Sequence, residues 1–112
     1  MCVDKLICKD KLICSNTNTS GSIVFSCVGH ASAPIQYLAV LLKAPGSYTL
    51  TLKNATGQSI SYVSNQGTGD FEFCVMKGFS LTSPNIYILD FSDVMIHEIN
   101  MATMCLCNPD EC

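Results

Sequence analysis

The sequence predicts an all-β protein, a jelly-roll-like two-sheet sandwich that begins with an extended N-terminal arm. Two patterns and the chain length predict this fold class. Apolar and polar residues alternate over several short segments, which is the period of a half-buried β-strand. Turn-forming residues separate these segments at a close spacing that is typical of sandwiches and jelly rolls. At 112 residues the chain makes one domain, large enough to bury a core without disulfide bonds.

The arm covers residues 1–15 and is marked by a short repeat. It reads MCVDKLICKDKLICS, in which Asp-Lys-Leu-Ile-Cys occurs twice at a period of six. Because six is even, Cys2, Cys8 and Cys14 would share one side of an extended chain, whereas a helix would scatter them. Such an arm spans about 40 Å, enough to cross from one small domain onto the next. The apolar residues expected to dock on the neighbour are Leu6, Ile7, Leu12 and Ile13.

A polar hinge at residues 16–21 joins the arm to a body at residues 22–112. The first body segment, Ser22 to Val28, alternates and places Ile23, Phe25 and Cys27 on one side. The segment from Ser47 to Lys53 alternates more strictly, so three of its side chains are expected to face inward: Tyr48, Leu50 and Leu52. After a turn at residues 54–57, we expect Ile60 and Tyr62 to continue this period.

The second half of the body continues the pattern of short strands. Phe71, Phe73 and Val75 alternate with Glu72, Cys74 and Met76, which places Cys74 on the face opposite the two phenylalanines. Strands are also expected from Ile86 to Asp90 and from Val94 to Cys107.

Two segments admit a helix as well as a strand. The residues from Pro34 to Ala44 could form a short helix, but their continuous apolar run and flanking turn residues favour a buried central strand. The stretch from Asp93 to Met104 is similarly ambiguous, and its β-branched residues favour a strand.

The cysteines are concentrated at the two ends of the chain. Of eight, three lie in the first 14 residues and three in the last eight. This distribution suits pairing between chains as well as within one. So many cysteines indicate oxidation at some stage, yet the first residues contain no apolar segment of signal-peptide length. We therefore expect a protein that is made in the cytoplasm without a signal peptide and oxidised after the cell lyses.

Composition excludes several classes of function. The net charge is −3 and the chain has no Arg, so it lacks the dense basic face of a nucleic-acid-binding protein. No apolar run approaches the roughly 20 residues of a membrane span. No nucleophile elbow, Gly-rich oxyanion loop or carboxylate pair indicates an enzyme, and no cofactor is expected.

In layout the chain resembles the subunits of bacterial endospore appendages, the Ena fibre proteins. The likeness rests on the cysteine-bearing N-terminal extension, the Ser/Thr-rich all-β body and the C-terminal cysteines. The segment Leu6-Ile7-Cys8 followed by Cys14 fits the single-cysteine version of the family's connector. The repeated block, the early Cys2 and the absence of a Cys-Cys pair depart from the family pattern.

The resemblance implies an eight-stranded jelly roll whose connector enters a neighbouring subunit and forms disulfides there. The chain would then be a structural subunit of an extracellular, spore-surface fibre, with other copies of itself as partners. Spore-surface anchor or tip proteins are further expected partners, and no nucleic acid or membrane is expected. The candidate intermolecular disulfide residues are Cys8 and Cys14 in the arm and Cys27, Cys105 and Cys107 as acceptors.

Other interpretations stay open. The main alternative is a monomeric, disulfide-rich extracellular binding module. A metal ion could be held by four residues, Cys105 and Cys107 together with His30 and His97. However, alternate residues of a strand share a face whether or not a metal ion is bound, so no metal site is expected. The segment Asp90–Asp93 is predicted to be a solvated turn rather than a carboxylate cluster.

Overall fold

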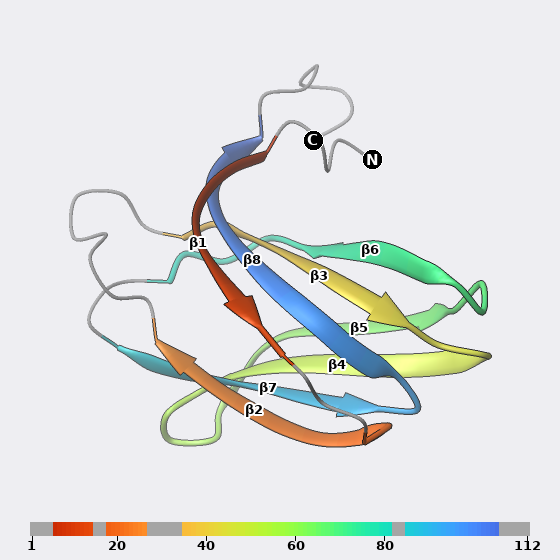
Figure 1. Cartoon of the computed structure of the whole chain (residues 1–112). Coiled ribbons are helices and arrows are strands. Elements are labelled where there is room, and N and C mark those ends of the chain that lie inside the picture. The colour runs from red at the N-terminus through yellow and green to blue at the C-terminus, as the bar shows by residue number, and fades with distance from the viewer. Residues whose placement is uncertain (1–5, 15–17, 27–34, 82–84, 106–112) are drawn as a thin grey trace.

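The computed structural model describes residues 6–14, 18–26, 35–81 and 85–105. These residues form an all-β structure of eight strands that pair antiparallel (Figure 1). In chain order the strands are β1 (Leu6–Ile13), β2 (Ser20–Ser26), β3 (Tyr37–Lys43), β4 (Ser47–Asn54), β5 (Ser59–Gln66), β6 (Phe71–Met76), β7 (Ile86–Ser92) and β8 (Met95–Cys105). In this part of the chain no helix is long and apolar enough to cross a membrane.

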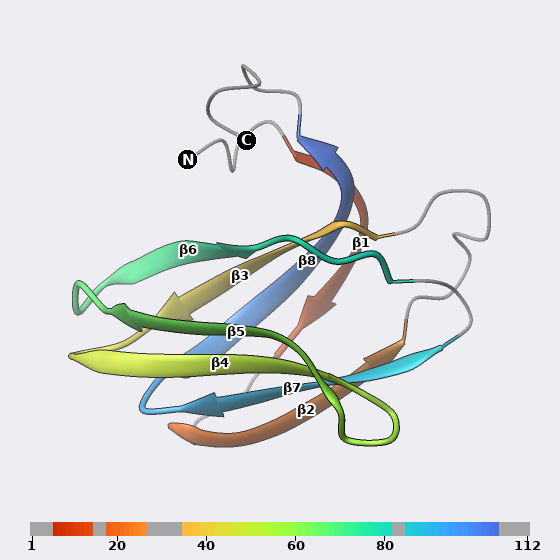
Figure 2. The same ribbon diagram turned by 180° about the vertical axis from the view of Figure 1, so that it is seen from behind.

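The strands form two four-stranded sheets that pack face to face (Figures 1 and 2). One has the order β1-β8-β3-β6 and is called here the β1 sheet. The other has the order β2-β7-β4-β5 and is called the β2 sheet. Apart from β4 and β5, which pair with each other in the β2 sheet, successive strands cross between the sheets, as in a jelly roll. The predicted fold class is therefore confirmed.

The two segments that could have been helices are strands. β3 lies between β8 and β6 in the β1 sheet, and Leu38, Ala39 and Val40 are all buried. A strand buried on both faces gives the continuous apolar run seen in the sequence. β8 is also central, since it pairs with β1 on one side and β3 on the other.

The core lies between the sheets and follows the predicted alternation. Tyr48, Leu50 and Leu52 of β4 are buried, while Phe25 of β2 is buried and its neighbour Val24 is 64% exposed. The inward residues of the β1 sheet complete the core: Leu38, Val40, Leu42, Cys74, Met76, Ile96, Ile99 and Met101.

The structure departs from the sequence prediction at three places in the β2 sheet. Tyr62 is 61% exposed instead of continuing the inward period, because it pairs with the outward residue Thr51. The segment predicted as a solvated turn belongs largely to β7, where Phe91 is buried, and only Asp93 lies in the turn, with a φ of 62°. β2 begins at Ser20, before the predicted end of the hinge.

Asp90 forms a small polar network on the outer face of the β2 sheet. The Lys53 ammonium lies 2.6 Å from its Oδ2, and the Ser22 hydroxyl donates to its Oδ1. These two partners hold the pKa of Asp90 below its ordinary value. The ion pair is partly exposed, so it contributes at most about 1 kcal/mol to stability. This contribution is fully present above the ordinary pKa of an aspartate and is lost as the pH falls through the lowered pKa of Asp90 in the folded chain.

Two turns pack closely at one end of the sandwich. The Gly69 amide donates to the Ala44 carbonyl and the Gly67 amide donates to the Gly46 carbonyl, both at 2.9 Å. A Cβ on Gly67 would lie 2.2 Å from the Ala44 carbonyl oxygen, whereas a Cβ on Gly46 would meet nothing nearer than 3.9 Å.

We expect Gly67→Ala to lower the free energy of unfolding by about 1–3 kcal/mol or more, because backbone must move to accommodate the methyl group. Gly46→Ala is the matched control and should change it by less than about 1 kcal/mol. Urea unfolding followed by circular dichroism, with reductant present, measures both. Equal effects of the two substitutions would show that the turns do not pack as described.

Candidate functional site

The strand that carries the Asp-Lys-Leu-Ile-Cys repeat lies at an edge of the β1 sheet. In the described part of the chain, β1 pairs only with β8, from Leu6 opposite Cys105 to Ile13 opposite Glu98 (Figure 1). The pairing contains two register irregularities, on either side of Cys8. The segment predicted as an extended arm is thus extended and docked on its own chain, and its transfer to a neighbour stays a prediction.

The register of β1 on β8 separates the cysteines of the two strands. Cys8 lies opposite Ala102, and Cys105 lies opposite Leu6, two residues before Cys8 on β1. Cys8 and Cys105 are therefore not direct cross-strand neighbours in this register.

Cys14 immediately follows β1 and belongs to the core. Its backbone amide donates to the His97 carbonyl at 2.7 Å, and its side chain is buried. Burial, and secondly the charge of Glu98, raise the pKa of its thiol. An intermolecular disulfide at Cys14 would therefore require the end of β1 to separate from β8.

Cys74 carries a free, buried thiol in β6, at the other edge of the same sheet. Alternation predicted that Cys74 lies on the side opposite Phe71 and Phe73, and the structure shows that this side is the one that faces the core. Burial is the main cause of the raised pKa of Cys74. Since β8 and β3 lie between the two edges, Cys14 and Cys74 are about 14 Å apart across the sheet and cannot bond to one another.

The neighbour of Cys74 across the core is the Tyr48 hydroxyl. This buried hydroxyl has no hydrogen bond of normal geometry within the described residues, although the side chains of Cys74 and Asn65 lie near it. Burial, followed by the Cys74 thiol, raises the pKa of Tyr48. Tyr48 belongs to β4 and Cys74 to β6, so these two uncharged groups lie next to each other across the interface between the two sheets.

The remaining predicted residues are placed only in part. The backbones of Leu6, Ile7, Leu12 and Ile13 pair with β8. Among the acceptor candidates, Cys105 ends β8, whereas Cys27 and Cys107 lie outside the described residues, as does His30. The described residues contain no cluster of three His, Cys, Asp or Glu side chains that could hold a metal ion.

A pocket of about 520 Å³ opens where the pairing of β3 with β6 is interrupted. The regular pairing ends at Leu38 opposite Met76, and a single bridge between Ile35 and Leu81 follows. Between these points two residues on the β3 side oppose four residues after β6, an irregularity that widens the gap between the strands. Gly78, with a φ of 90°, lets the longer side bend away.

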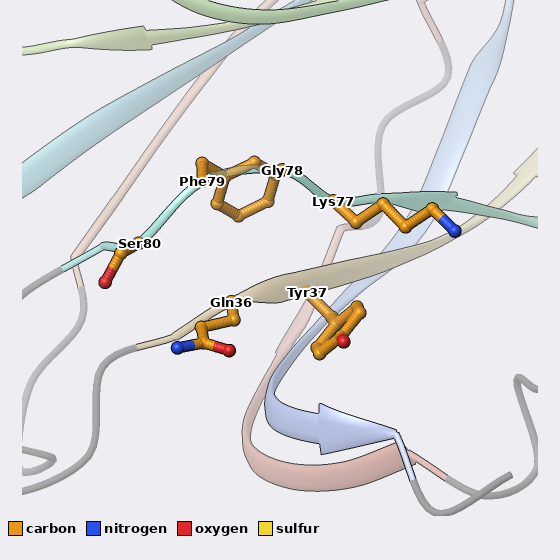
Figure 3. Close-up of a pocket in the computed structure, with 6 residues that line it drawn as sticks. All are labelled: Gln36, Tyr37, Lys77, Gly78, Phe79 and Ser80. Atoms are coloured by element: carbon orange, nitrogen blue, oxygen red, sulfur yellow. The ribbon is translucent and has the colours of Figure 1, made fainter. Parts of the chain in front are cut away.

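The pocket combines two aromatic rings with polar side chains. Gln36 and Tyr37 lie on the β3 side, and Lys77, Gly78, Phe79 and Ser80 lie on the opposite side (Figure 3). Tyr37 and Phe79 are half-buried, whereas the three polar side chains are exposed. The sequence patterns do not indicate this pocket, because the unequal lengths of the two sides appear only once the strands are paired.

Comparison with known proteins adds a structural likeness and no family. No protein-family model and no curated protein match the chain. Among solved structures, it resembles the carbohydrate-binding module CsCBM6-3 from Clostridium stercorarium, which was solved in complex with cellobiose. The TM-score is 0.64 at 10% sequence identity, with 85% of this chain and 94% of the module covered. At this identity the likeness supports the sandwich fold alone.

The burial of Cys74 predicts slow reaction with alkylating reagents in the folded, reduced protein. We expect iodoacetamide at pH 8 to modify Cys74 at least tenfold more slowly than the exposed thiol of a Ser64→Cys variant, because both access and thiolate formation are limited. Peptide mass spectrometry measures both rates, and the difference should disappear in urea. Equal rates in the folded protein would contradict the placement of Cys74.

Proposed function

We propose that the chain is a structural subunit that assembles into a disulfide-crosslinked extracellular fibre by pairing its N-terminal segment with a neighbouring copy. One observation carries this proposal. The segment with the repeated Asp-Lys-Leu-Ile-Cys is the outermost strand of its sheet and is paired with β8 alone in the described chain.

An edge strand of this kind can be exchanged between identical subunits. When β1 leaves its own β8 and pairs with the β8 of a neighbour, the same backbone pairing forms again. Exchange of an identical element is therefore a low-cost route to assembly. The donor's own β8 then presents an open edge that accepts the strand of a third copy. Contacts of this head-to-tail type form closed rings or propagate as filaments.

The positions of the cysteines support locking of such an assembly by disulfides. Cys8 and Cys105 of one chain are not directly opposite each other in the register of β1 on β8, which is compatible with bonds from these residues to other copies. A disulfide across a donated strand would make dissociation depend on reduction rather than on affinity. Under this proposal Cys8 and Cys14 are arm residues, and Cys27, Cys105 and Cys107 are acceptors. The resemblance to Ena proteins supports a location on the spore surface.

The full-length oxidised chain tests this proposal. After free thiols are blocked, it should run as a series of covalent oligomers on a denaturing gel, collapse to monomer with reductant, and form filaments in negative-stain electron microscopy. Cys8→Ser should shorten the series by removing one crosslink position while leaving β1 able to pair. The matched control Cys74→Ala should leave the series unchanged, because Cys74 is buried away from β1.

A second test separates strand exchange from accidental thiol oxidation. In the presence of reductant, a synthetic peptide of residues 1–14 should compete with subunit association, because it can occupy the open edge of β8. A compact monomer with and without reductant, and no filaments, would overturn the fibre proposal. So would covalent oligomers that persist unchanged when all the proposed crosslink residues are replaced by serine together: Cys8, Cys14, Cys27, Cys105 and Cys107.

A second candidate function is carbohydrate binding. It specifies a ligand for the alternative stated above, a monomeric extracellular binding module. The pocket beside Tyr37 supports this candidate, because aromatic rings combined with hydrogen-bonding side chains suit sugars. The likeness to a module solved with cellobiose makes it worth testing. The two candidates are compatible, since the pocket lies beside β6 and the exchangeable strand lies at the opposite edge of the sheet.

The carbohydrate candidate predicts retention of the reduced full-length chain on an insoluble polysaccharide. In pull-down assays with cellulose, chitin and xylan, at least one polymer should deplete the chain from solution, and a matching soluble oligosaccharide should release it. Bovine serum albumin controls for non-specific adsorption. Depletion that no soluble sugar reverses would count against this candidate.

A further inference from the structure

We infer that the gap between Gln36–Tyr37 and Lys77–Ser80 is the saccharide-binding site of this chain, with Tyr37 as the stacking residue. The inference rests on the carbohydrate candidate above and adds the site to it. It concerns a pocket that the fibre proposal does not use. Its volume of about 520 Å³ falls within the usual range of small-molecule sites.

The shape of this site comes from the backbone. Two bridges, Leu38 with Met76 and Ile35 with Leu81, fix the ends of the gap. The amide and carbonyl of Ile35 both bond to Leu81 at 2.8 Å, and the Gln36 amide bonds to the Ala102 carbonyl at 2.9 Å. The β3 side of the pocket is therefore held at both ends and against β8. A pocket with a rigid wall binds a ligand at a lower cost in ordering.

The side chains supply the two kinds of contact that a sugar ring uses. Leu38 faces the core, so Tyr37 faces the outer surface of the β1 sheet, where its half-buried ring offers an apolar face with a polar tip. Phe79 packs against the core and provides an apolar wall. An aromatic ring can stack on the C–H face of a pyranose. An ion or a small polar solute has no such apolar face.

The polar groups around the rings match hydroxyl ligands. Gln36 offers both a donor and an acceptor, Ser80 offers a hydroxyl, and Lys77 offers ammonium hydrogens. In Figure 3 the Gln36 and Ser80 side chains both extend downward in the view, from opposite walls of the pocket. Sugar hydroxyls both donate and accept, so they can satisfy this mixed set.

An extended peptide fits this position less well. A peptide that adds to a sheet needs a regular series of backbone donors and acceptors. Here the backbone after β6 is bent at Gly78, and four residues occupy the span of two on the other side. The regular spacing is therefore lost where the pocket lies.

The test is a titration of the ¹⁵N-labelled, reduced full-length chain with cellotetraose, chitotetraose and xylotetraose, followed by NMR. At least one sugar should shift the amide signals of Gln36, Tyr37 and Lys77–Ser80. Tyr37→Ala should weaken that binding at least tenfold, whereas Tyr37→Phe should retain most of it because the ring remains. The matched control Tyr62→Ala removes an exposed tyrosine from the other sheet and should leave affinity within twofold.

Other results of this titration would overturn either the site assignment alone or the carbohydrate candidate as well. Binding that shifts signals elsewhere, or that is unaffected by Tyr37→Ala in a variant with an otherwise unchanged spectrum, overturns this site and leaves the carbohydrate candidate standing. If no sugar in the panel binds and no polysaccharide retains the chain, the carbohydrate candidate fails and the site assignment fails with it. If the amide signals of the pocket shift with an unrelated extended peptide and with none of the sugars, the pocket is a peptide-binding site and the saccharide assignment is wrong.

Discussion

The antiparallel pairing of β3 with β8 is the contact on which the rest of the structure depends. These two strands form the centre of the β1 sheet, with β1 attached to β8 and β6 attached to β3. Val40 lies opposite Ile99 and Leu38 lies opposite Met101, and all four side chains are buried in the core. A shift of one residue in this pair would turn them toward solvent, so the register is strongly determined. That register also decides where β1 and the pocket lie.

The two proposed functional features occupy opposite sides of this central pair. The cysteine-bearing strand that we propose to exchange attaches to the outer side of β8, and the pocket opens between β3 and the chain beyond β6. Removal of β1 exposes the edge of β8 and leaves the pairing of β3 with β6 intact. A subunit could therefore donate its first strand to a neighbour and still present the pocket, so a fibre of such subunits would repeat that pocket along its length.

Burial divides the cysteines by chemical availability. Cys74 and Cys14 are buried in the folded chain, and burial raises the pKa of both thiols, which disfavours thiol–disulfide exchange. For Cys74 this protection lasts as long as the two sheets stay packed. For Cys14 it depends on the end of β1, which is also the strand proposed to move. The assembly step and the exposure of this thiol are therefore coupled through one element.

The sequence alone determined the strands and the inward residues of the more regular ones. Alternation identified Tyr48, Leu50 and Leu52 as core residues, because the two faces of a strand are a local property of the backbone. The apolar run and flanking turns around Leu38 likewise favoured a central strand. Only the tertiary structure decided that the repeat-bearing segment pairs with β8, that Tyr62 faces outward opposite Thr51, and that a pocket opens beside Tyr37. Pairing and register depend on contacts between residues far apart in the chain, which no local pattern records.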